Sequence, residues 1–376
     1  MLRSSQPLTG PNRRRCREDE LLLAAALAGA ARGFVLDMRS AQAAKQARMG
    51  GGGTEPKASY PRWKRLHRPL ERCDGAAPSA GARGTHPVWD GLASALGARR
   101  GRALQESFAR LVEACSDASL SMDRWLSRLE SSRWLSHVKA ALSTACLAAQ
   151  CLEREEACVL VHGAEGTDTT LLVTALAQLI LDPGCRTLTG FQELLEREWI
   201  QAGHPFHVRC ARSAFSHARP KQEAPLFLLF LDCVWQLGRQ FPRSLEFGER
   251  LLLALFDSAY ASPYGTFLGN SERERRVGTG ARAEPRPGGS GLRAAAARRR
   301  LCGVRQSTHC LWARLDQPAE RAALRNPLYA PNALALWPCV EPQSILLWQG
   351  LFLRWIRPAQ HLDEAWAEMR RLVEEE

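Results

Sequence analysis

Residues 157–170 read Ala-Cys-Val-Leu-Val-His-Gly-Ala-Glu-Gly-Thr-Asp-Thr-Thr. A short run of apolar and β-branched residues leads into a glycine-containing loop, and an almost wholly apolar segment follows at 170–181. A strand, a tight loop and a buried helix in this order direct backbone N–H groups and a helix N-terminus toward a bound phosphate. The stretch therefore predicts a phosphate-loop architecture at the end of a core strand.

Hydrophobic periodicity on either side of this loop predicts a chain that is mainly helical. Residues 34–36 form a further short strand, and Gly33 is expected to end a helix at 18–31. Apolar residues recur at helical spacing in six more segments. These segments are 103–116, 122–129, 134–151, 190–202, 226–240 and 249–259.

The loop resembles the signature of the myotubularin family, which reads His-Cys-x-x-Gly-x-Asp-Arg-Thr. Four positions match the signature, namely His162, Gly166, Asp168 and Thr170. At the other two, Gly163 and Thr169 stand where the family has Cys and Arg. Further stretches extend the resemblance over most of the chain. They are Arg-Ser-Ser-Gln-Pro-Leu at 3–8, Asp-Met-Arg at 37–39, Gly-Gly-Gly at 51–53, Gly-Phe at 190–191, Glu-Arg-Glu-Trp at 196–199, Gly-His at 203–204, Phe-Leu-Asp-Cys-Val-Trp-Gln at 230–236, Arg-Gln-Phe-Pro at 239–242 and Gly-Thr-Phe-Leu at 265–268.

The resemblance implies an α/β fold with a cysteine-dependent-phosphatase-like core, in which helices flank a central sheet. Members of the family are phosphoinositide 3-phosphatases, whose Cys thiolate attacks phosphorus while the Arg grips two phosphate oxygens. Because the matching motifs begin at residue 3, the resemblance also implies a chain that starts inside the phosphatase domain. The sheet is therefore expected to be incomplete at the N-terminus.

The two substitutions remove this chemistry from the loop. Gly163 has no side chain with which to attack, and Thr169 is short and uncharged. Cys158 lies five residues before Gly163 in the predicted strand, roughly 16 Å away at extended spacing, so it cannot replace the nucleophile. We therefore expect no catalytic residue, and we interpret the loop as degenerate. Its residues are His162, Gly163, Ala164, Glu165, Gly166, Thr167, Asp168 and Thr169.

Two side chains of the degenerate loop have simple structural interpretations. Asp168 matches the general acid proposed for the family, but its place directly before a helix favours a role as N-cap. His162 is interpreted as a structural histidine rather than a base. Glu165 and Asp168 add negative charge with no Arg in the loop to offset it, so at most a weak association with phosphoinositides is expected.

Composition and charge limit the other functions that the chain could have. The twelve cysteines form no C-x-x-C pair and no zinc-ligand spacing, and we expect no metal and no cofactor. The net charge of +12 suggests an anionic partner. However, residues 272–303 hold nine Arg against three Glu with no aromatic residue for base stacking, which argues against a nucleic-acid site. The chain shows neither a signal peptide nor an apolar run of about 20 residues, which predicts a cytoplasmic protein, peripheral on endomembranes.

The domain organisation follows from these patterns. Residues 1–358 are expected to form one phosphatase-like domain, with low-complexity inserts at about 73–102 and 276–300 that are expected to be disordered. Residues 359–376 are expected to begin a coiled-coil helix that is truncated here. Its apolar seam is Leu362, Trp366, Met369 and Val373, spaced 4, 3 and 4 residues apart. An amphipathic helix packed on the domain is the alternative.

The resemblance places the chain in the catalytically inactive branch of the family. It implies a regulatory subunit or adaptor that binds active myotubularins and modulates dephosphorylation of phosphatidylinositol 3-phosphate. Two alternatives remain open on the sequence alone. One is an active phosphoinositide 3-phosphatase with a divergent site, and the other is a basic module that binds anionic membranes.

Overall fold

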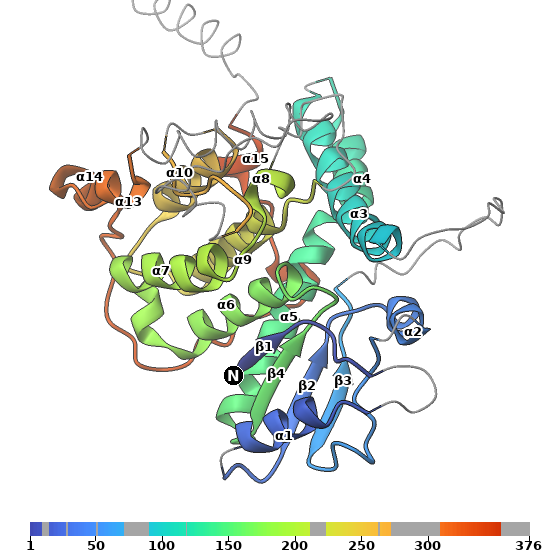
Figure 1. The fold of residues 1–376 in the computed structure, drawn as a ribbon. Coiled ribbons are helices and arrows are strands. Elements are labelled where there is room, and N and C mark those ends of the chain that lie inside the picture. Colours follow the sequence, from blue (N-terminus) through green and yellow to red (C-terminus); the bar gives the residue numbers. More distant parts are fainter. Residues whose placement is uncertain are drawn as a thin grey trace, which may run out of the picture.

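The computed structural model describes residues 1–9, 15–27, 29–49, 52–70, 90–117, 119–210, 223–261, 264–271 and 309–354, with the backbone alone at 90–102. It is a mixed α/β structure in which helices surround a parallel sheet (Figure 1). The fold class predicted from the loop and its resemblance is therefore confirmed. Among the described residues, no helix is both long and apolar enough to cross a membrane.

The sheet has four parallel strands in the order β1-β4-β2-β3. They are β1 (Leu2–Ser4), β4 (Cys158–His162), β2 (Gly33–Asp37) and β3 (Trp63–His67). The two central strands read Gly-Phe-Val-Leu-Asp and Cys-Val-Leu-Val-His, near-continuous apolar runs of the kind that parallel sheets covered on both faces require. At their ends, His162 lies level with Asp37 on one side and Ser4 on the other.

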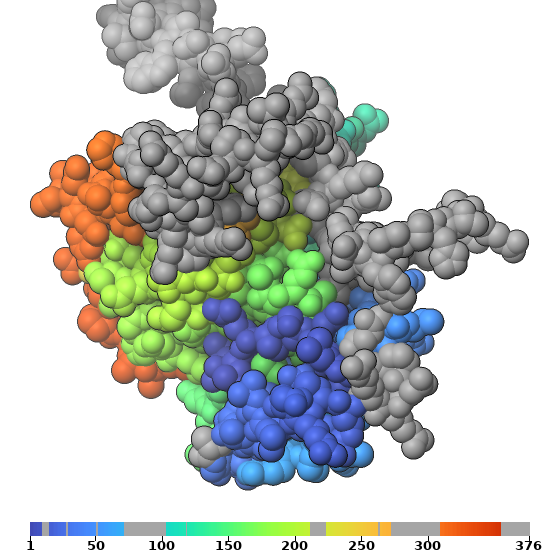
Figure 2. Space-filling view, in the orientation of Figure 1, coloured from blue at the N-terminus to red at the C-terminus, as the bar shows by residue number. Residues whose placement is uncertain are grey.

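Alternate residues of the central strands face two different layers. Val35 and Leu160 pack with Leu23 and Leu27 of the segment around α1 (Arg17–Ala26). Val159 and Val161 belong to the larger core, which α5 (Trp134–Glu153) lines with a row of Ala, Val and Leu. The first residues of the chain, dark blue in Figure 2, adjoin green residues from its middle, as the pairing of β1 with β4 requires.

Outside the sheet, most of the residues that the structure describes are helical. The longer helices are α2 (Ala41–Met49), α3 (Asp90–Ser116), α4 (Met122–Ser132), α6 (Thr169–Leu181), α7 (Leu188–Leu195), α9 (Leu226–Gln240) and α10 (Glu249–Tyr260). The short ones are α8 (Phe206–Arg209), α13 (Leu311–Leu315), α14 (Pro318–Leu324) and α15 (Gln349–Phe352), with 3-10 turns at Pro183–Arg186 and Pro342–Ser344 and a π-helical turn at Glu196–Gln201.

Two predicted elements differ from the structure. The helix expected at 18–31 ends at Ala26, because the chain has turned by Gly29, whose φ is +103°. The first insert, expected to lack regular structure over 73–102, is helical from residue 90 onward within α3. Residues 90–102 are rich in Ala, Leu and Arg, which favour helix strongly enough to outweigh the intervening glycines. The rest of that insert up to residue 89, and the whole insert at 276–300, lie outside the described residues.

A buried carboxyl group ties α9 to α5 and, through Gln236, to the non-helical segment at Leu346. Asp232 of α9 is completely buried and accepts hydrogen bonds from Trp134 Nε1 (2.7 Å) and Gln236 Nε2 (3.0 Å). Two hydrogen bonds fix Gln236 to the backbone of Leu346. Gln236 Nε2 donates to Leu346 O (2.7 Å), and Gln236 Oε1 accepts from Leu346 N (3.2 Å). Burial raises the pKa of Asp232 to about 6, although both hydrogen bonds favour the carboxylate.

Candidate functional site

The predicted loop lies at the carboxyl edge of the sheet, between β4 and α6. In parallel α/β structures this edge is where ligand crevices form. The loop turns tightly at Gly166, whose φ is +76°, and here it passes the backbone of the first strand. A Cβ placed on Gly166 would lie 2.8 Å from the carbonyl carbon and oxygen of Ser4, so no larger residue fits without a shift of the backbone. Because position 166 is glycine, the loop can pack directly against the backbone of the 3–8 motif.

A pocket opens against the loop, and six of the eight loop residues line it. They are Gly163, Ala164, Glu165, Gly166, Asp168 and Thr169, whereas His162 and Thr167 do not contribute to the lining. The opposite walls are mainly apolar, formed by Leu70, Ala103, Leu104, His137, Ala224, Leu226 and Leu229, together with Arg209. Burial lowers the pKa of His137, so at neutral pH this side chain adds no charge to the pocket.

Gly163 lies on the wall of this pocket without a side chain. A Cβ built there would lie 3.5 Å from Thr170 Cγ2 and 3.7 Å from Thr169 Oγ1, which are ordinary van der Waals distances. The position therefore has room for a side chain that the sequence does not supply. Cys158 begins β4 at the opposite end of the strand, where its thiol donates to Ala26 O (3.3 Å). None of the described residues that line the pocket is a cysteine.

Asp168 occupies the position before α6, but it does not cap the helix. Its side chain accepts no hydrogen bond from the backbone of the first turn, which corrects the N-cap interpretation. Instead it lies 2.5 Å from Arg209 Nη2 and 3.3 Å from His204 Nδ1. Burial opposes ionisation, but the hydrogen bond from His204 and the charge of Arg209 outweigh it and lower the pKa of Asp168 to about 2.

Arg209 is the functional residue that sequence reasoning missed. The loop was expected to lack any Arg to offset its acidic residues, yet this guanidinium reaches the pocket from α8 and offsets Asp168. Arg209 follows the recognised Gly-His motif at 203–204 by five residues, and His204 Nδ1 also contacts the Thr167 carbonyl oxygen (3.0 Å). The position of Arg209 five residues after that motif was the signal that the sequence offered. Glu165 is exposed and lines the same pocket, and no ion pair of its carboxylate is seen among the described residues.

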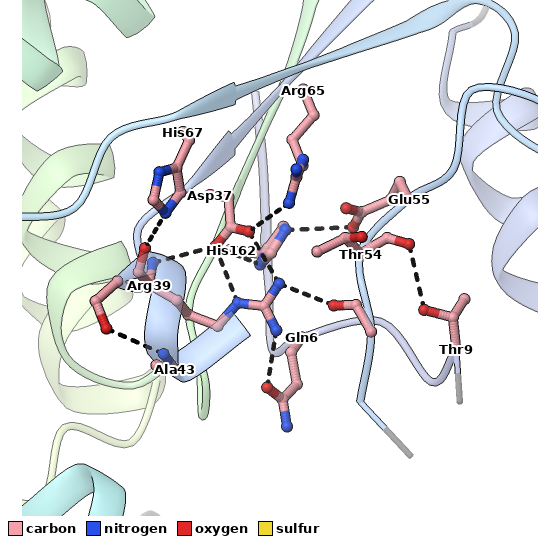
Figure 3. Close-up of polar contacts among 12 residues, drawn as sticks. Gln6, Thr9, Asp37, Arg39, Ala43, Thr54, Glu55, Arg65, His67 and His162 are labelled. Carbon is pink, nitrogen blue, oxygen red and sulfur yellow. Dashed lines mark hydrogen bonds and ion pairs between the residues drawn. The ribbon is translucent and has the colours of Figure 1, made fainter. Parts of the chain in front are cut away.

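Beneath the loop, the motifs at 3–8, 37–39 and 51–53 meet in one buried polar cluster (Figure 3). The Arg39 guanidinium is bidentate to Asp37, with both bonds at 2.9 Å, and also donates to Gln6 Oε1 (3.0 Å) and Gly53 O (2.8 Å). Burial alone would raise the pKa of Asp37. The hydrogen bonds from Arg39 and the nearby His162 lower it by more than burial raises it, so the pKa of Asp37 is lowered overall. These contacts hold the end of β2 against the segments that carry Gln6 and Gly53, and Met38 N donates to His162 O (3.0 Å) at the end of β4.

His162 ends β4 inside this cluster and is completely buried. Its Nε2 lies 3.3 Å from Glu55 Oε1 and its Nδ1 lies 3.9 Å from Asp37 Oδ1, but neither nitrogen makes a hydrogen bond within the described part of the chain. The side chain therefore belongs to this buried cluster and not to the pocket that six other loop residues line. The predicted seam of Leu362, Trp366, Met369 and Val373 lies outside the described residues.

Comparisons with known proteins bear on this site. The family model for the myotubularin-like phosphatase domain matches residues 1–276. A myotubularin-related protein 9-like protein of Bos taurus is 62% identical over 376 residues, which is 99% of this chain and 60% of that protein. Myotubularin-related protein 9 of Homo sapiens is 48% identical, over 100% of this chain and 59% of its own length. A Gallus gallus protein named phosphatidylinositol-3,5-bisphosphate 3-phosphatase MTMR8 is 33% identical, over 94% of this chain and 48% of its own length.

The chain thus spans less than two thirds of the length of these relatives. The predicted resemblance to the myotubularin family is confirmed, and among its members the proteins named myotubularin-related protein 9 and 9-like are 48% and 62% identical along this chain. The family match covers the strand, the loop, the helix after it and the buried cluster beneath. The chain therefore belongs to the myotubularin family, as a protein with a myotubularin-like phosphatase domain.

Proposed function

We propose that this chain is a non-catalytic member of the myotubularin family that serves as a regulatory subunit or adaptor. Its partners are active myotubularin-related phosphatases, whose dephosphorylation of phosphatidylinositol 3-phosphate it modulates. We place it in the cytoplasm, peripherally on endomembranes. The observation that carries the proposal is Gly163, which leaves a loop of phosphatase shape without a nucleophile.

The composition of the pocket supports a role without catalysis. A cysteine-dependent phosphatase needs a thiolate to form the phospho-enzyme and a guanidinium to hold the phosphate oxygens. Gly163 and Thr169 supply neither group. Arg209 is present in the pocket, but it is paired with Asp168 rather than directed at an open oxyanion position. Because the catalytic groups of such a site act as a unit, one remaining guanidinium does not restore turnover.

The relatives support the same proposal. The proteins named myotubularin-related protein 9 share 48% of residues with this chain in Homo sapiens and Mus musculus. Those whose names state a phosphatase activity share 33% in Gallus gallus and 31% in Homo sapiens. The chain is therefore more similar to relatives whose names state no phosphatase activity.

The first test measures phosphate release from phosphatidylinositol 3-phosphate, with an active myotubularin as positive control. We expect the purified chain to remain at the level of a blank without protein. Gly163→Cys should fold, since the built Cβ makes only ordinary contacts, and should also remain at the blank because Thr169 offers no guanidinium. Turnover by the unchanged chain would instead support the divergent-enzyme alternative.

The second test adds the chain to an active myotubularin-related phosphatase and follows both the initial rate and the thermal unfolding of the partner. A regulatory subunit should raise the rate or the unfolding temperature in proportion to its occupancy. The control is the same chain after heat denaturation. If neither quantity changes at chain concentrations well above that of the enzyme, the regulatory role is wrong.

A further inference from the structure

The ion pair between Asp168 and Arg209 has the geometry with which a guanidinium holds an oxyanion. Two nitrogens of Arg209 face two oxygens of the same carboxylate, Nη2 to Oδ2 at 2.5 Å and Nε to Oδ1 at 3.3 Å. Arg binds carboxylate and phosphate through the same bidentate arrangement. In this pocket the oxyanion that Arg209 holds is the carboxylate of Asp168, a side chain of the same chain.

The position of the pair places it in the pocket rather than on the surface. Both residues line the same pocket as Gly163, Ala164 and Thr169. Arg209 is 7% exposed and the Asp168 side chain is 23% exposed, so the carboxylate is the more accessible member of the pair. Among the described residues that line the pocket, no other carries a positive charge at neutral pH.

The surroundings fix both partners in this arrangement. His204 lies 3.3 Å from the second oxygen of Asp168 and is itself held by the Thr167 carbonyl. Arg209 ends α8, is buried, and has further interactions besides this pair. The carboxylate is therefore a built part of the site. An added oxyanion would have to displace it or share its guanidinium, with repulsion from the carboxylate in either case.

We propose that Asp168 acts as an internal oxyanion for Arg209, and that this pairing keeps free phosphate and phosphate monoesters out of the pocket. Arg209 is thus a latent oxyanion receptor, and Asp168 determines what the pocket accepts. Asp168 is the acidic residue that the family signature places in the loop. In this chain it also excludes phosphate, because position 169 has no Arg to bind the phosphate and offset the charge of Asp168. This inference is independent of whether the chain regulates a partner phosphatase.

The test is calorimetric titration of the full chain with inorganic phosphate, and it requires no turnover. The unchanged chain should show no saturable binding. Asp168→Asn removes the charge but keeps the shape, and it should bind phosphate at least tenfold more tightly. Adding Arg209→Gln to that variant should abolish the gain, because the gain depends on the released guanidinium.

A matched control comes from the same loop. Glu165→Gln removes the same charge from an exposed carboxylate for which no contact with Arg209 is seen. It should change phosphate affinity less than twofold. If Glu165→Gln tightens binding as much as Asp168→Asn, general repulsion explains the exclusion and the proposal is wrong. Strong phosphate binding by the unchanged chain would overturn it as well.

Asp168→Asn removes one charged partner of the buried Arg209 guanidinium, so the folding of this variant is measured separately. If the variant unfolds in chloride, thermal unfolding is repeated with phosphate at matched ionic strength. Phosphate about tenfold above its dissociation constant should raise the unfolding temperature by about 2 °C in Asp168→Asn and leave the Asp168→Asn/Arg209→Gln variant unchanged. An equal response of both variants would contradict the proposal, since the response would then not involve Arg209.

Discussion

The backbone of Ser4 lies so close to Gly166 that a single added methyl group on Gly166 would meet its carbonyl at 2.8 Å. This contact brings the first strand against the turn of the loop, and it combines with a φ of +76° that L side chains rarely adopt. The loop can therefore keep its shape only with glycine at this position.

Gly166→Ala should consequently destabilise the domain by about 3 kcal/mol, from the backbone strain and the displacement of Ser4 together. Chemical denaturation of the two proteins measures the difference. Gly203→Ala is the matched control, because Gly203 has a φ of +84° but no atom within 4 Å of the added Cβ. It should cost only about 1 kcal/mol. Equal effects at the two sites would show that the contact with Ser4 contributes nothing.

The buried pair of Asp37 and Arg39 should be far more important for stability than the outer pair of Asp37 and Arg65. Arg39→Met leaves a completely buried carboxylate without its bidentate partner and should cost about 3–5 kcal/mol. Arg65→Met removes a side chain that is 37% exposed and 3.4 Å from the same carboxylate, and it should cost less than about 1 kcal/mol. Denaturant midpoints at neutral pH give both values. A reversed order would contradict the assignment of Arg39 as the central residue of the cluster.

Asp232 should make stability depend on pH between about 4 and 6. Its pKa in the folded chain, about 6, lies above its ordinary value of 3.8, so the folded state binds the proton more tightly than the unfolded state. The stabilisation is fully present below the ordinary pKa and is lost as the pH rises through about 6, by on the order of 2–3 kcal/mol. Asp168 has its pKa lowered to about 2, and its contribution is lost only as the pH falls below about 4, so the two windows are separate.

The measurement compares Asp232→Asn with the unchanged chain by chemical denaturation at several pH values. Asn cannot accept both hydrogen bonds, from Trp134 and from Gln236, so the absolute stability of the variant is not the readout. The free energy of unfolding of Asp232→Asn, relative to that of the unchanged chain, should increase as the pH rises from 4 to 7. A difference that stays constant over this range would show that Asp232 does not titrate there.

How far the sequence can predict this molecule depends on how local each feature is. The strand at 158–162, the loop and the helix after it were predictable because apolar runs and glycines lie next to one another in the chain. The buried cluster was not, although its three motifs had been recognised, because parallel pairing of β2 with β4 brings Asp37 beside His162 across a long separation. Arg209 was missed for the same reason, since only the packing of α8 places it beside Asp168.

The coiled-coil helix expected at 359–376 remains a prediction, and it concerns partner binding. A seam of Leu362, Trp366, Met369 and Val373 alone buries too little surface to offset the entropy of association. Extending the chain through a coiled coil of family length should raise its affinity for an active myotubularin at least tenfold, on the order of 1.4 kcal/mol. Leu362→Asp with Met369→Asp should abolish the gain without unfolding the domain. Equal affinity of the short and extended chains, by calorimetry, would place the interface on the phosphatase-like domain instead.

The open space beside Gly163 has a consequence for how such a sequence evolves. Because neighbouring atoms neither require glycine there nor exclude a small side chain, folding exerts almost no selective pressure on the position. Gly166, three residues later, is constrained by its own backbone. Mutations can therefore accumulate at one site and be eliminated at the other within a single turn of chain. A lineage can lose the reactive side chain in one step, with its architecture intact, and keep every surface on which a non-enzymatic role could later be selected.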